Sequence, residues 1–375
     1  MEVSRRTEDF LLDVVYGGRK DLLARLIRLG LLGLSWIYRL AIWLYLLPFH
    51  LRIRRKRRLC CPVISVGNLT VGGTGKTPAV RYVCDGLIGR GWNPAVLSYG
   101  YGGILHGRFA LVSDGKNTLM SAVDVGDEPV MLARQLKGVP ILTGKDREHT
   151  GRMAVQDFGA NVCVLDDGLQ VWKLHRDLDI VLVDGNNPFD NGRLIPAGRL
   201  REPPNALKKA GIILITGKLY TRSEKDIAEA VSKIKKVAPN AKIFITGYRV
   251  THLTYLQDGN HLHQKEIKGR KVFVLSSIAR PEAFEQTVER IGATIAGRAH
   301  FRDHHLYSKE DLTMVCALAK NSGAEFIVTT EKDSVKLSSE MEFPVVVVGI
   351  TMYLDDEEGF WNIVANCVKN FDGPK

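Results

Sequence analysis

A glycine-rich loop that directly follows a short apolar run constrains this 375-residue chain more than any other feature. Residues 61–77 read CPVISVGNLTVGGTGKT, and the run at 63–66 is typical of a buried parallel strand. The loop ends in GKT at 75–77 and is followed by Pro78, a favoured first residue of a helix. A strand, a glycine-rich turn and a helix start in this order predict a phosphate-binding loop.

The residue types in this loop suit a nucleoside triphosphate and its magnesium ion. Glycines let the backbone N–H groups face phosphate oxygens, Lys76 can reach the terminal phosphates, and the Thr77 hydroxyl can hold Mg²⁺. The general motif has a glycine where this chain has Thr70. We predict that a nucleoside triphosphate, with Mg²⁺ as the accompanying ion, binds Thr70, Gly72, Gly73, Thr74, Gly75, Lys76 and Thr77.

Another apolar run ends in two carboxylates. Residues 162–168 read VCVLDDG, which predicts a strand that ends at Asp166 and Asp167. An acid at such a strand end holds the magnesium of a bound nucleotide directly or through water. We therefore predict that Thr77, Asp166 and Asp167 hold the metal. The sequence leaves open which carboxylate contacts it.

Apolar strands alternate with helical stretches from residue 63 onward, which is the pattern of an α/β protein. A polar stretch at 251–268 separates this region from further strands that begin at 271. We predict a P-loop NTPase-like, doubly wound, mostly parallel sheet with a smaller C-terminal α/β lobe and an N-terminal membrane-associated helix. The predicted divisions are 1–58, 59–250, 251–270 as a linker or hairpin, and 271–375.

The N-terminal region combines a long apolar segment, 22–51, with the basic run LRIRRKRRL that follows it. Arg28, Ser35 and Arg39 recur at helical spacing, and a helix that lies in the membrane interface keeps such arginines hydrated. Each cation near an anionic leaflet contributes about 1 kcal/mol to membrane binding. We predict attachment to a membrane surface, and the sequence leaves open whether the helix spans it.

The net charge of +11 is local, because residues 1–58 contain thirteen Lys or Arg and only five Asp or Glu. A nucleic-acid-binding protein carries its basic residues over a folded face with aromatic residues between them, and no stretch here has that pattern. The six cysteines include no CxxC pair, which argues against a zinc site and a disulfide framework. We expect no nucleic-acid partner and infer no obligate protein partner.

Two acidic and histidine-rich segments are candidates for chemistry. Asp127 and Glu128 stand just before an apolar helix, where the residue types alone favour a capping role. His304 and His305 follow Asp303, but adjacent side chains point in different directions and no third ligand is suitably spaced. An acid–base or orienting role is therefore favoured over metal binding.

Eight motifs together resemble a known family. In order over residues 63–333 they are VGNLTVGGTGKTP, LSYGYGG, VGDEP, GKDR, LDDGLQ, GRLREP, FRDHH and TTEKD. This set is similar to the tetraacyldisaccharide 4'-kinases of lipid A biosynthesis. The resemblance implies transfer of the ATP γ-phosphate to the 4'-hydroxyl of a tetraacylated glucosamine disaccharide 1-phosphate, at the cytoplasmic face of the bacterial inner membrane.

The resemblance also implies roles for individual residues. Asp127 matches the catalytic acid of the family and His304 its partner, which replaces the capping interpretation of Asp127, and Lys76 matches the phosphate-binding lysine. The family usually has arginine where this chain has Tyr99. Arg147 and Arg199 match positions that would face the sugar phosphate or the nucleotide, and Tyr101 and Glu202 are further expected substrate-binding residues.

One alternative function is open at this point, a membrane-tethered nucleotide switch without lipid kinase activity. A GTPase would need an Asn/Thr-Lys-x-Asp motif after a late strand to read guanine. Residues 330–333 read TEKD, with the lysine one position out of register. The motif therefore does not favour a GTPase.

Overall fold

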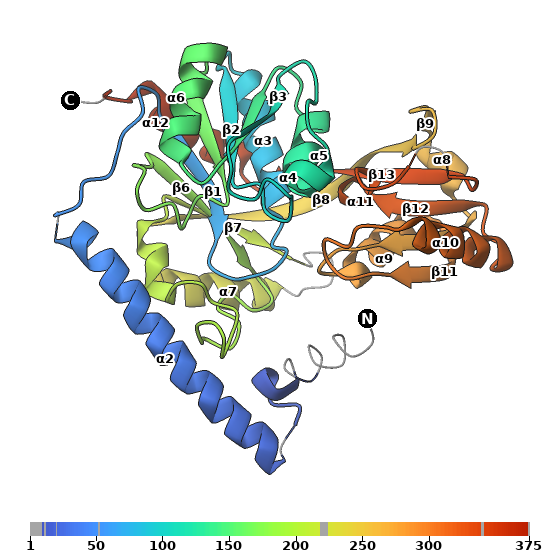
Figure 1. Cartoon of the computed structure of the whole chain (residues 1–375), viewed down its shortest axis with the longest axis horizontal. Helices are drawn as coiled ribbons and strands as arrows, with labels where there is room; N and C mark the ends of the chain where they lie inside the picture. The colour runs from blue at the N-terminus through green and yellow to red at the C-terminus, as the bar shows by residue number, and fades with distance from the viewer. Residues whose placement is uncertain are drawn as a thin grey trace.

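A single sheet runs through both lobes of the protein (Figure 1). The computed structural model describes residues 10, 13–19, 21–51, 53–217, 224–338 and 341–373, so Arg52 of the basic run lies outside the described residues. The sheet has thirteen strands in the order β11-β10-β12-β13-β8-β7-β6-β1-β5-β2-β4-β3, and β9 pairs with β8 outside this path. The mostly parallel α/β fold confirms the prediction.

The N-terminal lobe contains the phosphate loop and its supporting strands. Its strands are β1 (Val63–Asn68), β2 (Pro94–Ser98), β3 (Ala110–Asp114), β4 (Pro140–Thr143), β5 (Val162–Asp166), β6 (Leu178–Asp184) and β7 (Ile212–Thr216). All neighbouring pairs among them are parallel except β3 with β4. Because the carboxyl ends of parallel strands share one edge, the loops after β1, β2 and β5 meet there.

Two long strands connect the lobes. They are β8 (Lys242–Tyr255) and β13 (Val345–Leu354), which pair antiparallel along their length. At its start β8 also pairs with β7, and β13 pairs with β12 of the second lobe. The register between them shifts at Gly349 and Ile350, where β8 contains one extra residue.

The C-terminal lobe contains a smaller, mostly parallel part of the same sheet. Its remaining strands are β9 (His261–Leu262), β10 (Lys271–Ser276), β11 (Thr294–His300) and β12 (Phe326–Thr330). The predicted linker, 251–270, contains the end of β8, all of β9 and the short helix α8 (Gln264–Ile267). The domain divisions stay a prediction.

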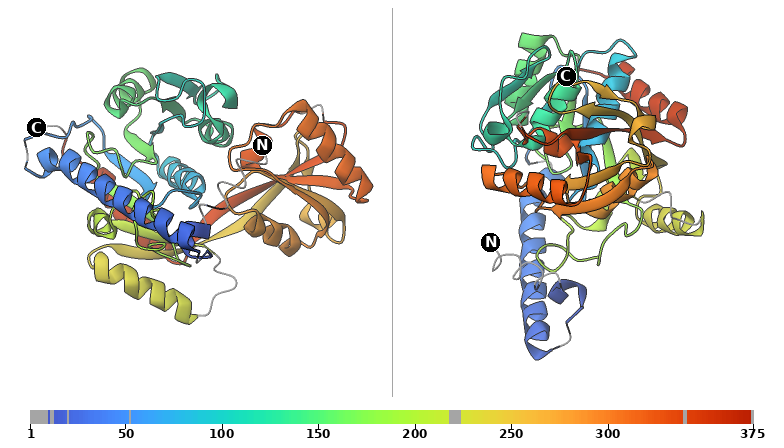
Figure 2. Two further views of the ribbon diagram at one scale, coloured as in Figure 1. Left: turned by 60° about the horizontal axis from the view of Figure 1, so that its bottom comes forward. Right: turned by 90° about the vertical axis from the view of Figure 1, so that its right-hand side faces the viewer.

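Helices cover both faces of the sheet (Figures 1 and 2). In the first lobe they are α3 (Lys76–Ile88), α4 (Ala122–Val125), α5 (Asp127–Gln135), α6 (Arg147–Phe158), the 3₁₀ helix η1 (Pro204–Lys209) and α7 (Glu224–Val237). The later ones are α9 (Pro281–Arg290), α10 (Lys309–Asn321), α11 (Glu331–Ser334) and α12 (Glu357–Lys369). The largest core cluster packs α3 and α12 against the central strands, which fixes α3 and the phosphate loop at its start.

Two strands were not predicted, β3 and β11. The β3 sequence ALVSD is short, and the β11 sequence TIAGRAH contains glycine and charged residues. Both are edge strands, which need only one paired neighbour and bury less surface than central strands. A continuous apolar run is therefore not required at either position.

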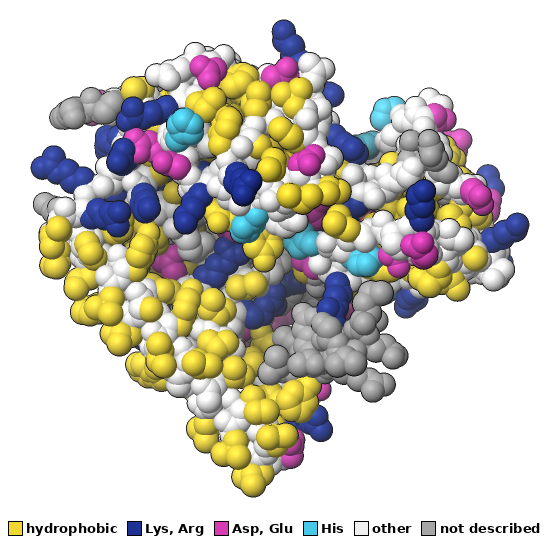
Figure 3. Space-filling model, in the orientation of Figure 1, with side chains coloured by type: hydrophobic (Ala, Val, Ile, Leu, Met, Phe, Trp, Pro, Cys, Tyr) yellow, Lys and Arg dark blue, Asp and Glu magenta, His cyan; other side chains and the backbone are white. Residues whose placement is uncertain are grey.

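The N-terminal helix α2 (Leu22–His50) lies along the first lobe and projects beyond it (Figures 1 and 2). The Ser35 hydroxyl donates to the Leu194 carbonyl at 3.0 Å, and the Tyr38 hydroxyl donates to the Arg201 carbonyl at 3.1 Å. Part of the predicted polar face therefore contacts the protein itself. Hydrophobic side chains cover the outward face of α2 (Figure 3).

Candidate active site

Two glycines shape the phosphate loop. Gly75 precedes α3 with a φ of +84°, and a side chain there would collide with the hydroxyl of Tyr248 on β8. Gly72 has a φ of +111°, and a side chain there would collide with the guanidinium of Arg199. Only glycine adopts such φ values freely. The loop conformation thus depends on both glycines for backbone freedom and for space.

Asn68, the last residue of β1, holds this loop in place. Its Nδ2 donates to the Thr70 carbonyl and to Thr74 Oγ1, each at 2.8 Å, and its Oδ1 accepts from Lys76 Nζ at 3.4 Å. Sequence reasoning did not identify Asn68 as a site residue. Its one signal in the sequence is a polar side chain at the end of an apolar strand.

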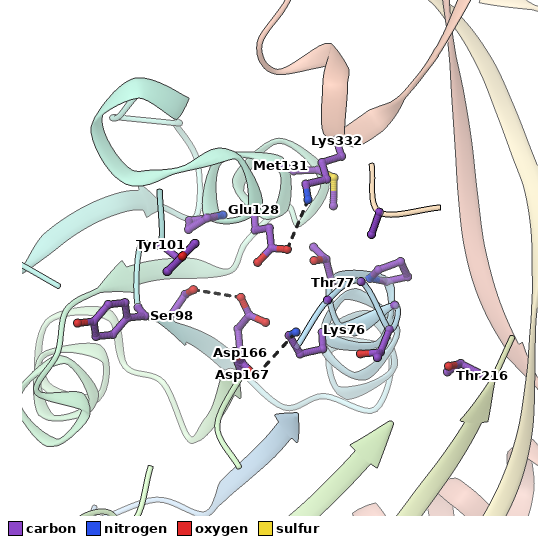
Figure 4. Close-up of a pocket in the computed structure, with 18 of the residues that line it drawn as sticks. Lys76, Thr77, Ser98, Tyr101, Glu128, Met131, Asp166, Asp167, Thr216 and Lys332 are labelled. Carbon is purple, nitrogen blue, oxygen red and sulfur yellow. Dashed lines mark hydrogen bonds and ion pairs between the residues drawn. The ribbon is translucent and has the colours of Figure 1, made fainter. Parts of the chain in front are cut away.

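The two carboxylates after β5 face the phosphate loop. Ser98 Oγ donates to Asp166 Oδ2 at 3.0 Å, and Lys76 Nζ lies 3.8 Å from Asp167 Oδ1 (Figure 4). Arg201 Nη1 donates to Asp167 Oδ2 at 2.7 Å. The structure thus brings the predicted phosphate-binding lysine and the predicted metal-binding acids together at one edge of the sheet.

The oxygen atoms present here are suitable ligands for a magnesium ion. Among the described residues, Asp166 Oδ1 and Asp167 Oδ1 have no hydrogen-bond partner, and Thr77 lies in the first turn of α3. Burial, with the nearby charges of Glu128 and Asp167, raises the pKa of Asp166 to about 7, and a bound cation would offset this. In the described ranges, no group of three His, Cys, Asp or Glu side chains could hold a metal ion on its own. Nucleotide oxygens would therefore have to complete the coordination shell of the magnesium ion.

Asp127 and His304 form a pair across the lobes. His304 Nδ1 lies 2.9 Å from Asp127 Oδ1 and 3.0 Å from Oδ2, although 177 residues separate them. The Asp127 side chain is 4% exposed and that of His304 is 33% exposed. His304 also has a φ of +62°, which is uncommon for a residue other than glycine and points to a constrained site.

The pair carries shifted pKa values. Burial opposes the charge on Asp127, but the hydrogen bond from His304 and the charges of Lys332, His304 and Lys336 outweigh it and lower its pKa. The hydrogen bond to Asp127 raises the pKa of His304, while burial and Lys332 act against that rise. Asp127 is also the first residue of α5, after Gly126, so it is not the N-cap itself.

A cavity of about 2190 Å³ connects these groups and lies between the lobes. Figure 4 shows Lys76, Glu128 and Lys332 on its walls, with side chains pointing toward the shared space. His304 lines it, and the Asp127 carboxylate lies behind His304. The cavity also reaches Tyr45 and Phe49 near the end of α2.

The four predicted substrate-binding residues divide into two groups. Tyr101 and Arg147 line the cavity, and among the described residues Arg147 Nε and Nη1 have no hydrogen-bond partner. Burial lowers the pKa of Arg147 to about 10. Arg199 instead donates from Nε to the Val71 carbonyl at 3.0 Å, which supports the phosphate loop. Glu202 is buried and accepts from Gln170 at 3.2 Å.

Arg201 and Lys332 line the cavity and were not among the predicted site residues. Arg201 lies two residues beyond the predicted Arg199, within the same GRLREP motif. Lys332 belongs to the TTEKD motif, which the sequence analysis recognised without a role. A motif shows that a segment matters, but which of its side chains points inward depends on backbone geometry.

A phosphate loop and an acid pair at the carboxyl edge of a parallel sheet, facing an Asp–His pair, define a P-loop phosphotransferase. The family described as Tetraacyldisaccharide-1-P 4'-kinase matches residues 27–369. The chain belongs to this family. Membership makes it an ATP-dependent kinase and confirms the resemblance found in the motifs.

Individual relatives agree over most of the chain. A tetraacyldisaccharide 4'-kinase from Syntrophus aciditrophicus is 39% identical over 343 residues, covering 90% of this chain and 92% of its own. One from Geobacter metallireducens is 40% identical over 316 residues, covering 84% and 90%. The crystal structure of Aquifex aeolicus LpxK in complex with ATP has a TM-score of 0.75 at 28% identity, covering 91% of this chain and 99% of that one.

Proposed function

We propose that this chain transfers the γ-phosphate of ATP to the 4'-hydroxyl of a tetraacylated glucosamine disaccharide 1-phosphate, a precursor of lipid A. The observation that carries this proposal is the Asp127–His304 pair beside a cavity that the phosphate loop also lines. Such a pair can orient an alcohol and take its proton. The neighbouring loop would hold the phosphate that the alcohol attacks.

The proposed reaction is a displacement at phosphorus. The sugar oxygen forms a bond to the γ-phosphorus, the bond from that phosphorus to the bridging oxygen breaks, and ADP leaves. The hydroxyl proton passes to the Asp127–His304 pair, in which Nδ1 of His304 contacts the carboxylate. Lys76 stabilises negative charge on the transferred group.

The magnesium ion and the anionic acceptor complete the proposed site. Thr77, Asp166 and Asp167 would hold Mg²⁺, which supplies charge neutralisation on the phosphates. Arg147 is the buried cation best placed to face the sugar phosphate, because it lines the cavity and keeps two N–H groups without hydrogen-bond partners among the described residues.

The proposed acceptor is a membrane lipid, and α2 provides a means of reaching it. In the described part of the chain, α2 is the one helix that is both long enough and apolar enough to cross a membrane. Its most apolar stretch has a mean hydropathy of 1.5, and 11% of that stretch is buried in the protein. The cavity extends to Tyr45 and Phe49 at its end. We propose that α2 attaches the kinase to the cytoplasmic face of the bacterial inner membrane, where ATP and the lipid headgroup meet.

The direct test is incubation of the full-length protein with γ-³²P-labelled ATP, Mg²⁺ and the lipid A disaccharide precursor in mixed micelles. We expect label in the lipid, dependent on both the lipid and the protein. Asp127→Asn should abolish labelling while nucleotide binding persists. Nucleotide binding with no lipid-dependent ATP consumption would instead support the switch.

A further inference from the structure

The TTEKD segment lines the cavity, but its side chains have no assigned role in the proposed reaction. Its Glu331, Lys332 and Asp333 form α11, which begins where β12 ends and packs against α5. Figure 4 shows the Lys332 side chain reaching toward Glu128.

Lys332 contacts the far side of the His304 ring. Its Nζ lies 3.2 Å from His304 Nε2 and donates to Asp303 Oδ1 at 2.9 Å. It also lies 3.9 Å from Asp127 Oδ2 and 3.9 Å from Glu128 Oε1. The His304 ring is thus held between a carboxylate at Nδ1 and an ammonium group at Nε2.

This arrangement specifies where the ring proton is. An ammonium group has three donors and no acceptor, so Nε2 must be the acceptor in the contact with Lys332. Burial opposes the charge on Lys332, but Asp127, Glu128 and Asp303 outweigh it and raise its pKa, so the ammonium persists at neutral pH. The single proton of a neutral ring then lies on Nδ1, facing Asp127.

We propose that Lys332 is a positioning residue of the phosphotransfer reaction, which fixes His304 as the neutral ring that donates from Nδ1 to Asp127. The catalytic meaning of this inference rests on the proposed function. The ring state itself can be measured without any lipid substrate.

Contacts of α11 hold Lys332 at a fixed place relative to the phosphate loop. Glu331 Oε1 accepts from Arg81 of α3 at 3.3 Å, and its Oε2 accepts from the backbone N–H of Ile350 on β13 at 3.1 Å. On the other side of Lys332, Asp333 is fully buried and pairs with Lys336 at 2.9 Å. The segment therefore links α3, the strand between the lobes and the Asp–His pair.

Removing Lys332 would change the charge balance at the ring. The titratable groups in contact with His304 are Asp127, Asp303, Lys332 and Tyr101. Two more lie one contact further away, Glu128 against Lys332 and Lys336 against Asp127. Without the Lys332 ammonium, carboxylates are the nearest charges. The ring would then accept a second proton at higher pH, and a neutral ring would no longer have a fixed tautomer.

The first test is NMR of the full-length protein in detergent, with ¹⁵N-labelled histidine rings and His304→Gln to assign the signals. At pH values above the pKa of His304, the unaltered protein should show the single ring proton on Nδ1. In Lys332→Met the pKa of His304 should rise, and the two nitrogens should report exchange between tautomers. Lys320→Met, at an exposed lysine of α10, should leave these signals unchanged.

The second test is the pH dependence of turnover. Lys332→Met should lower kcat about ten- to a hundred-fold, the range found when hydrogen-bond partners of metal-bound imidazoles are removed, with a smaller effect on the KM for ATP. The acid side of its profile should shift to higher pH. Lys332→Arg keeps a charged hydrogen-bond donor at this position. It should therefore retain most of the activity, and the proton of the neutral His304 ring should stay on Nδ1.

An unchanged His304 ring state in folded Lys332→Met would overturn the inference, even if turnover fell, because the lysine would then be only structural. Thermal unfolding of each variant checks that it is folded. If the unaltered protein phosphorylates no lipid, the proposed function fails, while the NMR result still decides the role of Lys332.

Discussion

Gly75 shows how strongly the phosphate loop depends on its surroundings. The Tyr248 hydroxyl of β8 occupies the space that a side chain at Gly75 would fill. A glycine motif in sequence indicates backbone freedom, but here the packing of a strand about 170 residues away adds a second reason for it. The loop and the strand between the lobes are therefore in direct contact.

Gly75→Ala should weaken ATP binding, because the added methyl group forces the loop away from Tyr248 and from a conformation that alanine adopts poorly. We expect an ATP affinity at least about ten-fold lower, or roughly 1.4 kcal/mol, by isothermal titration. Gly91→Ala is a matched control, since Gly91 has a φ of +82° with open space around it. It should lower stability slightly and leave ATP affinity unchanged. Equal loss of affinity in both would contradict the steric argument.

The Asp127–His304 contact should make stability depend on pH. The pKa of His304 is raised above its ordinary value of 6.5. The contribution of the protonated ring to the free energy of unfolding is therefore complete below pH 6.5, and it falls as the pH rises through the pKa of the folded state. His304→Asn should therefore lower Tm more at pH 6 than at pH 9. Thermal unfolding of both proteins at both pH values measures this. His149→Asn, at an exposed histidine, is the control. A loss of Tm in His304→Asn that grows as the pH rises would contradict the argument.

Residue roles were predictable only where a motif specifies an atom. Lys76 and Thr77 follow from the chemistry of the phosphate loop. Asn68 and Lys332 could not be predicted, because their contacts depend on which side chain points inward. Arg199 is predicted to face the sugar phosphate or the nucleotide, and its contact with the loop was not foreseen, because it depends on the backbone after Gly198, which brings the guanidinium against Gly72.

At the scale of elements, α2 differs from the helices of the core. Its inner face contacts the 189–201 loop through Ser35 and Tyr38, whereas Trp36 and Ile37 are 67% and 65% exposed. Exposed apolar residues in such density mark an interaction surface. The apolar length of the helix was predictable from the sequence, but its docked face was not, since serine and arginine at helical spacing do not specify their partner.

Trp36→Glu with Ile37→Glu should weaken binding to lipid vesicles. Burial of each side chain in an apolar phase contributes about 1.5–3 kcal/mol, so the two together should lower the membrane partition coefficient by at least about a hundred-fold. Sedimentation with phospholipid vesicles measures the bound fraction. Met314→Glu replaces an exposed apolar residue of α10 and should have no such effect. Unchanged sedimentation of the double variant would show that another surface attaches the protein.

At the scale of the whole molecule, several ion pairs join the two lobes. They include Asp127 with His304, Arg81 with Glu331, and Asp184 with Arg280. The phosphate loop lies among them, and the cavity has walls from both lobes. A nucleotide bound there would contact both lobes and so favour the folded, assembled state.

ATP with Mg²⁺ should therefore raise the thermal stability of the whole chain. At a free concentration one hundred times Kd the gain is about 2.7 kcal/mol, which a thermal shift measurement resolves. Lys76→Ala should remove most of the gain, because the loop loses its terminal-phosphate contact. An exposed control, Lys320→Ala, should retain it. Stabilisation of Lys76→Ala equal to that of the unaltered protein would place the nucleotide elsewhere.

The shared strands β8 and β13 set how the lobes can move. A connection through flexible linkers would let two bodies swing freely, but here any change in the angle between the lobes must bend a hydrogen-bonded ribbon that carries both of them, and the ladder is locally disrupted at the extra residue, Thr251. A bound molecule that draws the lobes together would therefore have to supply the energy of bending this ribbon from its own binding.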